Sequence, residues 1–253
     1  MTTMLAAALA VLMSLAPCAR GDLRKSIFFV GAHPDDTEGF AATAFLLRDK
    51  YDIHVVDLTR GELGLGMAGY KDGTTAKTRM AEEARACAYL GATPHFLDEI
   101  DGFAYAGKTS VDRLVSLVRK YRPVAIFTHW PVDTHPDHVQ TAAVTRRAAS
   151  EAGFGGEYYF YEVLRSQTVN FRPLYSVDVT RTITNKVEML RKYACQNAND
   201  SLALVKHKQA KDRGKERKPE CAAAEVFTTY DGKPIANGVL ERLVETVKVS
   251  PVD

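Results

Sequence analysis

The sequence predicts a single α/β domain with a Rossmann-like, open and mostly parallel sheet that has helices on both faces. Short apolar runs alternate along the chain with longer amphipathic segments, and this alternation is typical of βαβ units. The 253 residues are 46% hydrophobic and 25% charged, which is the composition of an ordinary globular domain. No linker or internal repeat divides the chain into further domains.

Nearly continuous apolar runs mark the predicted strands. Three of them lie at residues 26–31, 53–58 and 124–127. Parallel strands covered by helices on both faces have this composition, because neither face meets water. Two further runs, at residues 158–163 and 175–179, are expected to extend the same sheet.

Amphipathic segments between the strands mark the predicted helices. The segment at residues 110–121 repeats valine and leucine at i, i+3, i+4 and i+7 from Val111, the spacing of one helix face. Pro123 then ends this helix, because proline disfavours helical backbone in the residue before it. Further helices are expected at residues 38–50, at residues 75–90 and near residues 182–195.

The charge balance limits the kinds of partner. The chain has 33 lysines and arginines against 31 aspartates and glutamates, a net charge of +2. So even a balance does not favour nucleic acid or an acidic membrane as the main partner, and we expect a small-molecule or glycan substrate. The basic tract at residues 206–218 is interpreted as a solvated surface loop. The sequence does not define an oligomeric state.

The first residues resemble an export signal. Residues 4–16 are apolar apart from Ser14, and this run is shorter than the ~20 residues of a membrane-spanning helix. We therefore predict a signal peptide at residues 1–21, a mature domain at residues 22–253 and a periplasmic or secreted location. A cytoplasmic location is the alternative, because no lysine or arginine precedes the run. Lipidation of Cys18 and a disulfide between Cys195 and Cys221 are left open.

Histidine and aspartate gather after two of the predicted strands. The first loop carries His33, Asp35 and Asp36, and the second covers residues 129–138. Open α/β sheets place their sites at the carboxyl ends of strands, so we expect the two loops to meet. Each residue alone has a plainer interpretation, because Asp, Glu or His at the start of a helix caps it. Two His-Pro-Asp segments at strand ends favour a shared site instead.

A metal centre is the chemistry that these residue types favour. Catalytic zinc is held by three protein ligands, mainly imidazole and carboxylate, and keeps a fourth position open. His33, Asp36 and His138 supply such a set. His54 and His207 are interpreted as background, because one lies within a predicted strand and the other in the basic tract.

The motifs AHPDD at residues 32–36 and HPDH at residues 135–138 resemble the LmbE/PIG-L family of zinc-dependent de-N-acetylases, which act on N-acetylglucosamine compounds. The segment DLTRGELG at residues 57–64 and the helix at residues 78–91 resemble members that deacetylate N-acetylglucosaminyl malate in bacillithiol synthesis. The resemblance covers about residues 27–149.

The resemblance implies a role for each residue that matches the family pattern. These residues are His33, Asp36 and His138 as ligands of Zn²⁺ or another divalent metal such as Fe²⁺, Asp35 as general base, His135 as a protonated partner of the oxyanion or leaving amine, Arg60 as substrate anchor, and Asp137 as the carboxylate that orients an imidazole.

The expected reaction is hydrolysis of an acetamide on an N-acetylglucosamine-containing saccharide or glycoconjugate, which gives acetate and a free amino sugar. Two alternatives remain open: a sugar-binding module without turnover, and an amidase of a thiol-pathway conjugate. A dinucleotide-binding oxidoreductase is disfavoured. Residues 64–69 match G-x-G-x-x-G, but another loop follows them where such a motif opens onto a helix.

Overall fold

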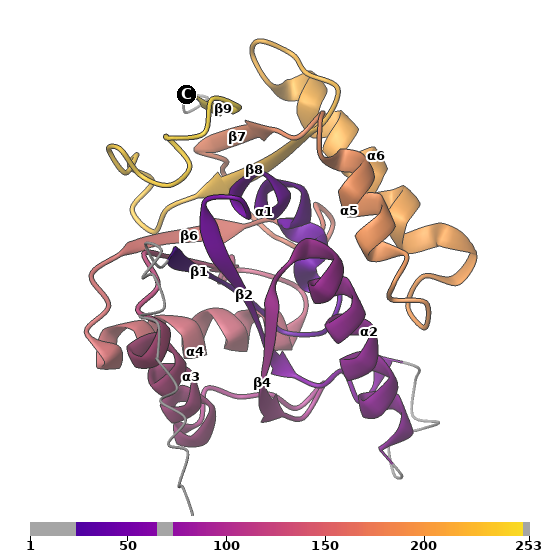
Figure 1. Ribbon diagram of the computed structural model, residues 1–253, viewed down its shortest axis with the longest axis vertical. Helices are drawn as coiled ribbons and strands as arrows, with labels where there is room; N and C mark the ends of the chain where they lie inside the picture. Colours follow the sequence, from indigo (N-terminus) through magenta and orange to yellow (C-terminus); the bar gives the residue numbers. More distant parts are fainter. Residues whose placement is uncertain (1–23, 65–72, 250–253) are drawn as a thin grey trace, which may run out of the picture.

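This computed structural model describes residues 24–64 and 73–249, and the strands within them form one sheet of eight (Figure 1). Its strand order is β4-β2-β1-β5-β6-β8-β7-β9. The strands are β1 Lys25–Gly31, β2 Tyr51–Thr59, β4 Thr93–Glu99, β5 Ala125–His129, β6 Glu157–Tyr161, β7 Tyr175–Asp178, β8 Ala224–Thr228 and β9 Thr246–Lys248. The predicted signal peptide, Cys18 and most of the G-x-G-x-x-G segment lie outside the described residues.

The sheet has a parallel part and an antiparallel part. The five strands from β4 to β6 pair in parallel, whereas β8, β7 and β9 continue the sheet through antiparallel pairs. The predicted open, mostly parallel α/β sheet is therefore confirmed. The sequence analysis missed β4, which is an edge strand that contains Pro94, and edge strands tolerate proline because one side of their backbone is unpaired.

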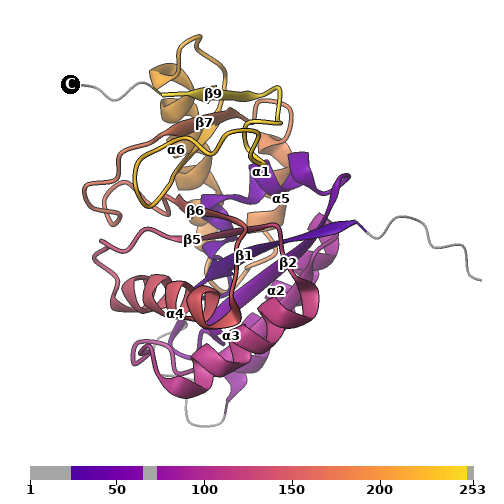
Figure 2. The same cartoon turned by 90° about the vertical axis from the view of Figure 1, so that its left-hand side faces the viewer.

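Helices cover both faces of this sheet (Figure 2). The helical segments are η1 Asp36–Gly39, α1 Ala41–Leu47, α2 Thr74–Leu90, α3 Lys108–Tyr121, α4 Pro136–Ala152, α5 Ile183–Leu190, η2 Ala198–Asp200 and α6 Ser201–Glu216. Among the described residues, no helix is both long and apolar enough to span a bilayer.

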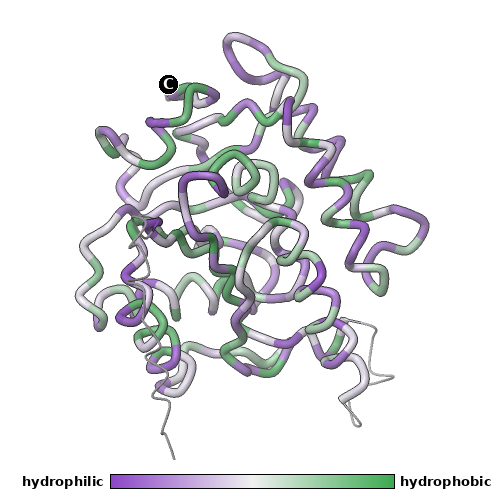
Figure 3. The backbone as a smooth tube through the Cα atoms, viewed as in Figure 1, coloured by the Kyte–Doolittle hydropathy of each residue, from purple (hydrophilic) through white to green (hydrophobic). Residues whose placement is uncertain are grey.

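Each face of the central strands packs into its own hydrophobic core. Ile27 and Phe29 of β1 contribute to the core under α1, α2, α5 and α6. Phe28 and Val30 point the other way, into the core under α3 and α4. In Figure 3, hydrophobic stretches run through the middle of the molecule, where these two cores lie.

The segment after β1 departs from the predicted helix at residues 38–50. A short 3-10 turn comes first, Phe40 has a non-helical φ of −142°, and α1 begins only at Ala41. The turn bends back because the Asp36 carboxylate accepts hydrogen bonds from the backbone N–H groups of Ala32 and His33. A helix that began at residue 38 would be incompatible with this loop.

The basic tract was wrongly predicted to be a solvated loop, because residues up to Glu216 belong to α6. Two of its cations are neutralised by carboxylates of other elements. Lys206 Nζ lies 2.5 Å from Glu38 Oε1, and Arg213 Nη2 lies 2.5 Å from Glu162 Oε1. These partners are distant in sequence, so a count of local charge could not reveal them.

Cys195 and Cys221 are free thiols and do not form a disulfide. The Cys195 thiol donates a hydrogen bond to Glu82 Oε2, and the Cys221 thiol donates to the carbonyl of Ala223. Each thiol is satisfied locally, so the fold is held together without the bridge that the sequence left open.

Candidate active site

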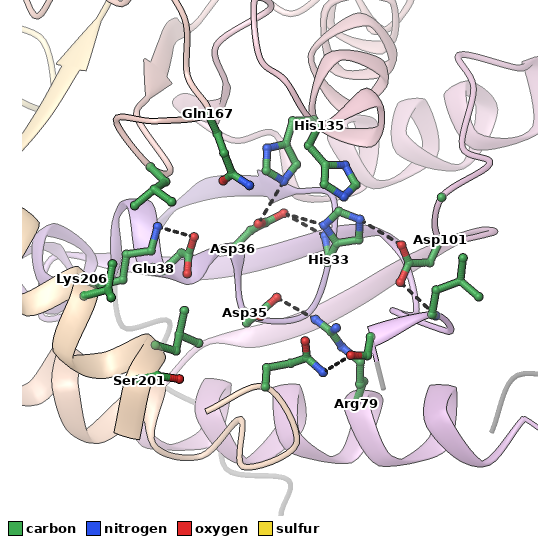
Figure 4. Close-up of a pocket in the computed structure, with 18 residues that line it drawn as sticks. His33, Asp35, Asp36, Glu38, Arg79, Asp101, His135, Gln167, Ser201 and Lys206 are labelled. Carbon is green, nitrogen blue, oxygen red and sulfur yellow. Dashed lines mark hydrogen bonds and ion pairs between the residues drawn. The ribbon is translucent and has the colours of Figure 1, made fainter. Parts of the chain in front are cut away.

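The two loops rich in histidine and aspartate meet at one edge of the sheet. β1 and β5 are neighbouring parallel strands that end at Gly31 and His129, so the residues that follow them leave the sheet side by side. Figure 4 shows His33, Asp36 and His135 of these loops around a common space. This is the arrangement that the sequence predicted for the loops.

His33, Asp36 and His138 are buried, and one ligand atom from each lies within 4.8 Å of the others. Asp36 lies between the two imidazoles. Its Oδ1 is 3.5 Å from Nε2 of His138, and its Oδ2 is 3.6 Å from Nδ1 of His33. Two imidazole nitrogens and a carboxylate oxygen are donors that zinc and related divalent ions accept. The residues present therefore fit a divalent metal.

The Asp36 carboxylate is held in place from several directions. Its Oδ2 accepts hydrogen bonds of 2.7 and 2.8 Å from the backbone N–H groups of Ala32 and His33, and it lies 3.0 Å from Nε2 of His129. Burial alone would raise the pKa of Asp36, but His129 and His138 outweigh burial and hold it well below its usual value. Asp36 is therefore an anion ready to bind a cation through Oδ1.

His129 orients Asp36, and the sequence analysis gave it no role. Its ring is buried and stacks on the His138 ring with 4.2 Å between centroids. Burial lowers its pKa to about 4, so the ring is neutral near pH 7. Its Nδ1 has no hydrogen-bond partner among the described residues, whereas its Nε2 faces Asp36 Oδ2 at 3.0 Å and the backbone N–H of Ala32 at 3.1 Å. The position of His129 at the very end of β5 was the available signal.

Carboxylates orient the two imidazoles of the candidate ligand set. Nε2 of His33 lies 3.1 Å from Asp137 Oδ2 and 3.3 Å from Asp101 Oδ1. Nδ1 of His138 lies 3.1 Å from Asp133 Oδ1. Each carboxylate accepts a hydrogen bond from one ring nitrogen and leaves the other nitrogen free for a metal. Asp137 thus contacts the ring of His33, a pairing that the sequence left open.

A second group of possible ligands overlaps the first. His33, His135 and Asp137 also bring ligand atoms within 4.8 Å of one another. Asp137 Oδ2, however, already accepts a 2.7 Å hydrogen bond from the N–H of Gly102 as well as the contact from His33. The set of His33, Asp36 and His138 is favoured, because Asp36 Oδ1 faces His138 Nε2 without a competing hydrogen bond.

Asp35 lies beside the candidate metal ligands in a strained backbone conformation. Its φ of 116° is in the region that residues other than glycine rarely adopt, and such strain persists where surrounding contacts enforce it. One carboxylate oxygen, Oδ1, accepts a 2.7 Å hydrogen bond from Nη2 of Arg79. Burial raises the pKa of Asp35 and Asp36 adds to this effect, whereas Arg79 opposes it. The result is a carboxylate more basic than an exposed aspartate.

Arg79 of α2 holds this strained turn, and the sequence analysis missed it. Its guanidinium also donates to the carbonyl of Pro34, so one side chain grips two successive residues. Gly61 and Gly64 pack against this guanidinium so closely that a Cβ at either position would overlap it. The available signal was an arginine at a position that shares one helix face with Ala86 and Leu90, the face that α2 buries.

Arg60, the expected substrate anchor, lies outside the set of residues that line the cavity beside these ligands. Its Nε donates to Glu62 Oε1 at 2.9 Å and lies 3.8 Å from Asp98 Oδ1. Two acidic partners therefore occupy its guanidinium. Arg79 lines the cavity instead, so the structure does not support the anchoring role that the resemblance implied for Arg60.

His135 both caps a helix and lines the cavity. It is the N-cap of α4, where its Nδ1 accepts a hydrogen bond from the N–H of Asp137, as the plainer interpretation of this residue expected. The same ring lines the cavity. Burial lowers the pKa of His135, and His33 and His138 lower it further. The structure therefore favours a neutral ring with its proton on Nε2, in place of the imidazolium that the sequence analysis expected.

The cavity at this site has a volume of about 600 Å³ and is lined by charged, polar and apolar side chains (Figure 4). Its walls come from segments far apart in the chain. The lining residues are His33, Asp35, Asp36, Glu38, Leu63, Gly64, Arg79, Asp101, Gly102, His135, His138, Leu164, Gln167, Gln196, Ser201, Leu202, Val205 and Lys206. A space of this size accommodates a sugar unit with part of its aglycone.

A buried ion pair forms part of the cavity wall. Lys206 of α6 donates to Glu38 and to the carbonyl of Val163, so its ammonium is neutralised and fixed. Burial raises the pKa of Glu38 to about 7, although Lys206 opposes that shift. The pair joins α6 to the loop that carries Asp35 and Asp36.

Residues 28–149 match the family model described as PIG-L, GlcNAc-PI de-N-acetylase. This segment, just under half of the chain, belongs to the PIG-L family. The matched segment of the PIG-L model includes the loops after β1 and β5 together with Arg79, whereas Lys206 and the rest of α6 lie beyond it.

Relatives with assigned names support the PIG-L assignment over part of their length. A 1D-myo-inositol 2-acetamido-2-deoxy-alpha-D-glucopyranoside deacetylase of Mycolicibacterium smegmatis is 30% identical over 156 residues, which are 50% of this chain and 53% of the relative. The chain spans about half the length of the curated relatives it matches.

Solved structures share the fold of this chain. An N,N′-diacetylchitobiose deacetylase from Pyrococcus horikoshii has a TM-score of 0.69 at 20% identity, covering 84% of this chain and 88% of its own. GalB, the 4-carboxy-2-hydroxymuconate hydratase of Pseudomonas putida, has a TM-score of 0.72 at 22% identity, covering 84% and 99%. The fold therefore occurs with more than one reaction, so the reaction has to be argued from the site.

Proposed function

We propose that this protein is a metal-dependent hydrolase that removes the acetyl group from an N-acetylglucosamine-containing saccharide or glycoconjugate. The observation that carries the proposal is the convergence of His33, Asp36 and His138 with Asp35 and His135 in one cavity of a PIG-L family member. The products would be acetate and the free amino sugar.

His33, Asp36 and His138 would hold the ion, with Zn²⁺ as first candidate and Fe²⁺ as alternative. A divalent ion in such a site supplies Lewis-acid polarisation of an amide carbonyl and lowers the pKa of water towards about 7. The carboxylates of Asp133 and Asp137 keep the two imidazoles turned towards that position. The protein thereby fixes the ligand geometry before substrate arrives.

Asp35 is the general base in this proposal. One of its oxygens is held by Arg79, which leaves the other to accept a proton from the water that attacks the acetamide carbon. Its raised pKa makes that transfer more favourable than for an exposed aspartate, and a positioned base contributes about 10²- to 10⁴-fold to a rate. The same proton then passes to the amide nitrogen as the C–N bond breaks.

His135 faces the cavity as a hydrogen-bond donor. With Nδ1 engaged by the backbone of Asp137, its Nε2–H is directed at the oxygen on which negative charge develops. A neutral donor held in this way stabilises the tetrahedral state without having to change its own orientation.

A second candidate concerns the substrate and leaves the reaction unchanged. The inositol conjugate in the name of the M. smegmatis relative favours a small, polar aglycone, and this suits an amidase of a thiol-pathway conjugate. A sugar-binding module without turnover is less well supported, because Asp35 and His135 both line the cavity. We also propose a periplasmic or secreted location from the apolar run at residues 4–16.

The test is acetate release by the purified protein loaded with Zn²⁺ or Fe²⁺. N-Acetylglucosamine, its chitooligosaccharides and its inositol and malate conjugates would be supplied in turn, with bound metal quantified in the same samples. We expect acetate from at least one class, its loss on chelation and its return with metal. Binding of a sugar without acetate release at full metal occupancy would favour the binding-module alternative.

A further inference from the structure

Three large apolar side chains are exposed within six residues beside the cavity. Ile100 is 43% exposed, Phe103 70% and Tyr105 64%. A single exposed apolar residue is ordinary, but a cluster of them marks a surface that binds something. Asp101 and Gly102, in the middle of this segment, line the cavity of the candidate active site. The exposed cluster is thus continuous with the site.

This segment is anchored at several points. Asp101 Oδ2 accepts a 3.0 Å hydrogen bond from the N–H of Leu63, and the N–H of Gly102 donates to Asp137 Oδ2 at 2.7 Å. Further along, the N–H of Ala106 donates to Gln140 Oε1 at 2.9 Å. The backbone that carries the rings is fixed to the carboxylates that surround His33.

Phe103 and Tyr105 both expose their rings on this anchored segment. Ala104 between them is buried in the core under α3 and α4, so the backbone that carries the two rings is held against the protein. The Tyr105 ring lies across the backbone of Gly107, where a Cβ would overlap it. Among the described residues, neither ring packs against another aromatic ring. Phe103 therefore presents its ring to solvent, and Tyr105 presents the part of its ring that Gly107 does not cover.

We propose that Phe103 and Tyr105 form a stacking subsite for a second sugar ring of an extended saccharide. The inference rests on the proposed function, because it places the N-acetylglucosamine unit in the cavity and its neighbour over the two rings. One face of a pyranose carries C–H groups with partial positive charge, and the face of an aromatic ring is partially negative. The contact is independent of the sugar's hydroxyl pattern and suits an oligosaccharide.

The surroundings of the rings favour a saccharide over other occupants. Residues 93–107 contain no lysine or arginine, so the segment lacks the cluster of cations with which a protein binds an anionic lipid surface. A stable protein interface buries about 800 Å² on each partner, far more than two side chains provide. A sugar ring matches the size of this pair and adjoins the cavity where its neighbour would react.

The test compares acetate release from N-acetylglucosamine and from N,N′,N″-triacetylchitotriose by the metal-loaded protein. We expect Phe103→Ala and Tyr105→Ala each to raise KM for the trisaccharide by about 3- to 10-fold, a factor typical of one ring contact, with KM for the monosaccharide unchanged. Phe103→Tyr and Tyr105→Phe should retain wild-type KM. Tyr230→Ala is the matched control, because Tyr230 is 60% exposed and does not line the cavity.

Two results would overturn the subsite. One is an equal loss on both substrates, which would indicate a structural effect of the substitutions. The other is an unchanged trisaccharide KM in the double alanine variant, which would leave the exposed rings to a protein partner. If the wild type releases no acetate at all, the proposed function fails. Titration of the trisaccharide into Asp35→Asn, with and without the alanine changes, then decides the subsite separately.

Discussion

The guanidinium of Arg79 donates a 2.7 Å hydrogen bond to the carboxylate of Asp35, across 44 residues of sequence. The same guanidinium binds the carbonyl of Pro34 and lies in a slot formed by Gly61 and Gly64. Asp35 has a strained φ of 116°, so its orientation depends on contacts that resist relaxation. The proposed general base is therefore positioned by a helix that contributes no metal ligand.

Replacing Arg79 should lower kcat with little change in KM. In Arg79→Met the turn at Asp35 can relax and the base loses its fixed direction, and we expect a loss of about 10²-fold, within the usual contribution of a positioned base. Arg79→Lys should recover part of the rate, because an ammonium can still bind one acceptor. Steady-state kinetics of acetate release with metal content measured in parallel would check this.

Arg60→Met is the matched control for the arginine prediction. Arg60 precedes the glycine slot but pairs with Glu62 and Asp98 outside the cavity lining. Both kinetic constants should stay within about twofold of wild type. A rise in KM for Arg60→Met with no effect of Arg79→Met would reverse the roles and restore the anchor that the sequence implied.

Asp35→Asn should separate catalysis from metal binding. The amide is nearly isosteric but cannot accept the proton of the attacking water, so we expect kcat to fall by about 10²- to 10⁴-fold with metal content unchanged. Titration of bound Zn²⁺ by calorimetry or atomic emission gives the second number. Turnover close to wild type in this variant would remove Asp35 from the role of base.

His138→Ala should instead abolish metal binding. The variant removes one of three donors, and the remaining pair of His33 and Asp36 cannot complete the site. His54→Ala is the matched control, because His54 is a buried histidine that contacts His95 and lies outside the cavity. Full metal occupancy in His138→Ala would favour the overlapping set of His33, His135 and Asp137.

The sequence predicted those site residues that directly follow the end of a strand. The loops with His33 and His138 lie together because parallel β1 and β5 are neighbours, a consequence that alternating strands and helices already imply. Arg79 and Lys206 could not be found in this way, since each reaches the site from a helix whose approach is decided by tertiary packing. Asp101 was missed for another reason: it follows an edge strand whose apolar pattern is weak.

Replacing only one residue of the Glu38–Lys206 ion pair should destabilise the folded protein. Both side chains are buried and lie 2.5 Å apart, so Lys206→Met would leave Glu38 without its cation at the cavity wall. Removing one partner of a buried pair typically destabilises a protein by about 3–5 kcal/mol. The double change Glu38→Gln with Lys206→Met should recover most of that loss, because no unpaired charge remains. Urea unfolding of the wild type, the single variant and the double variant measures the difference, and equal stability of the single and double variants would contradict the pairing.

Glu83 should make stability depend on pH. Burial raises the pKa of this carboxyl from 4.5 to about 7, although hydrogen bonds from Cys87 and Tyr193 oppose the shift. The folded state thus binds the proton more tightly than the unfolded state. The resulting stabilisation is fully present below pH 4.5 and is lost as pH rises to about 7, at a cost on the order of 3 kcal/mol.

Glu83→Gln removes this proton without removing the hydrogen-bonding side chain, so its stability relative to wild type should increase between pH 4.5 and pH 7. Urea unfolding of both proteins at several pH values in that window gives the difference, and groups common to the two proteins cancel. Glu151→Gln, on the exposed side of α4, should show a constant difference from wild type across the same window. A constant difference for Glu83→Gln as well would mean that Glu83 is already ionised in the folded protein, with the hydrogen bonds from Cys87 and Tyr193 outweighing its burial.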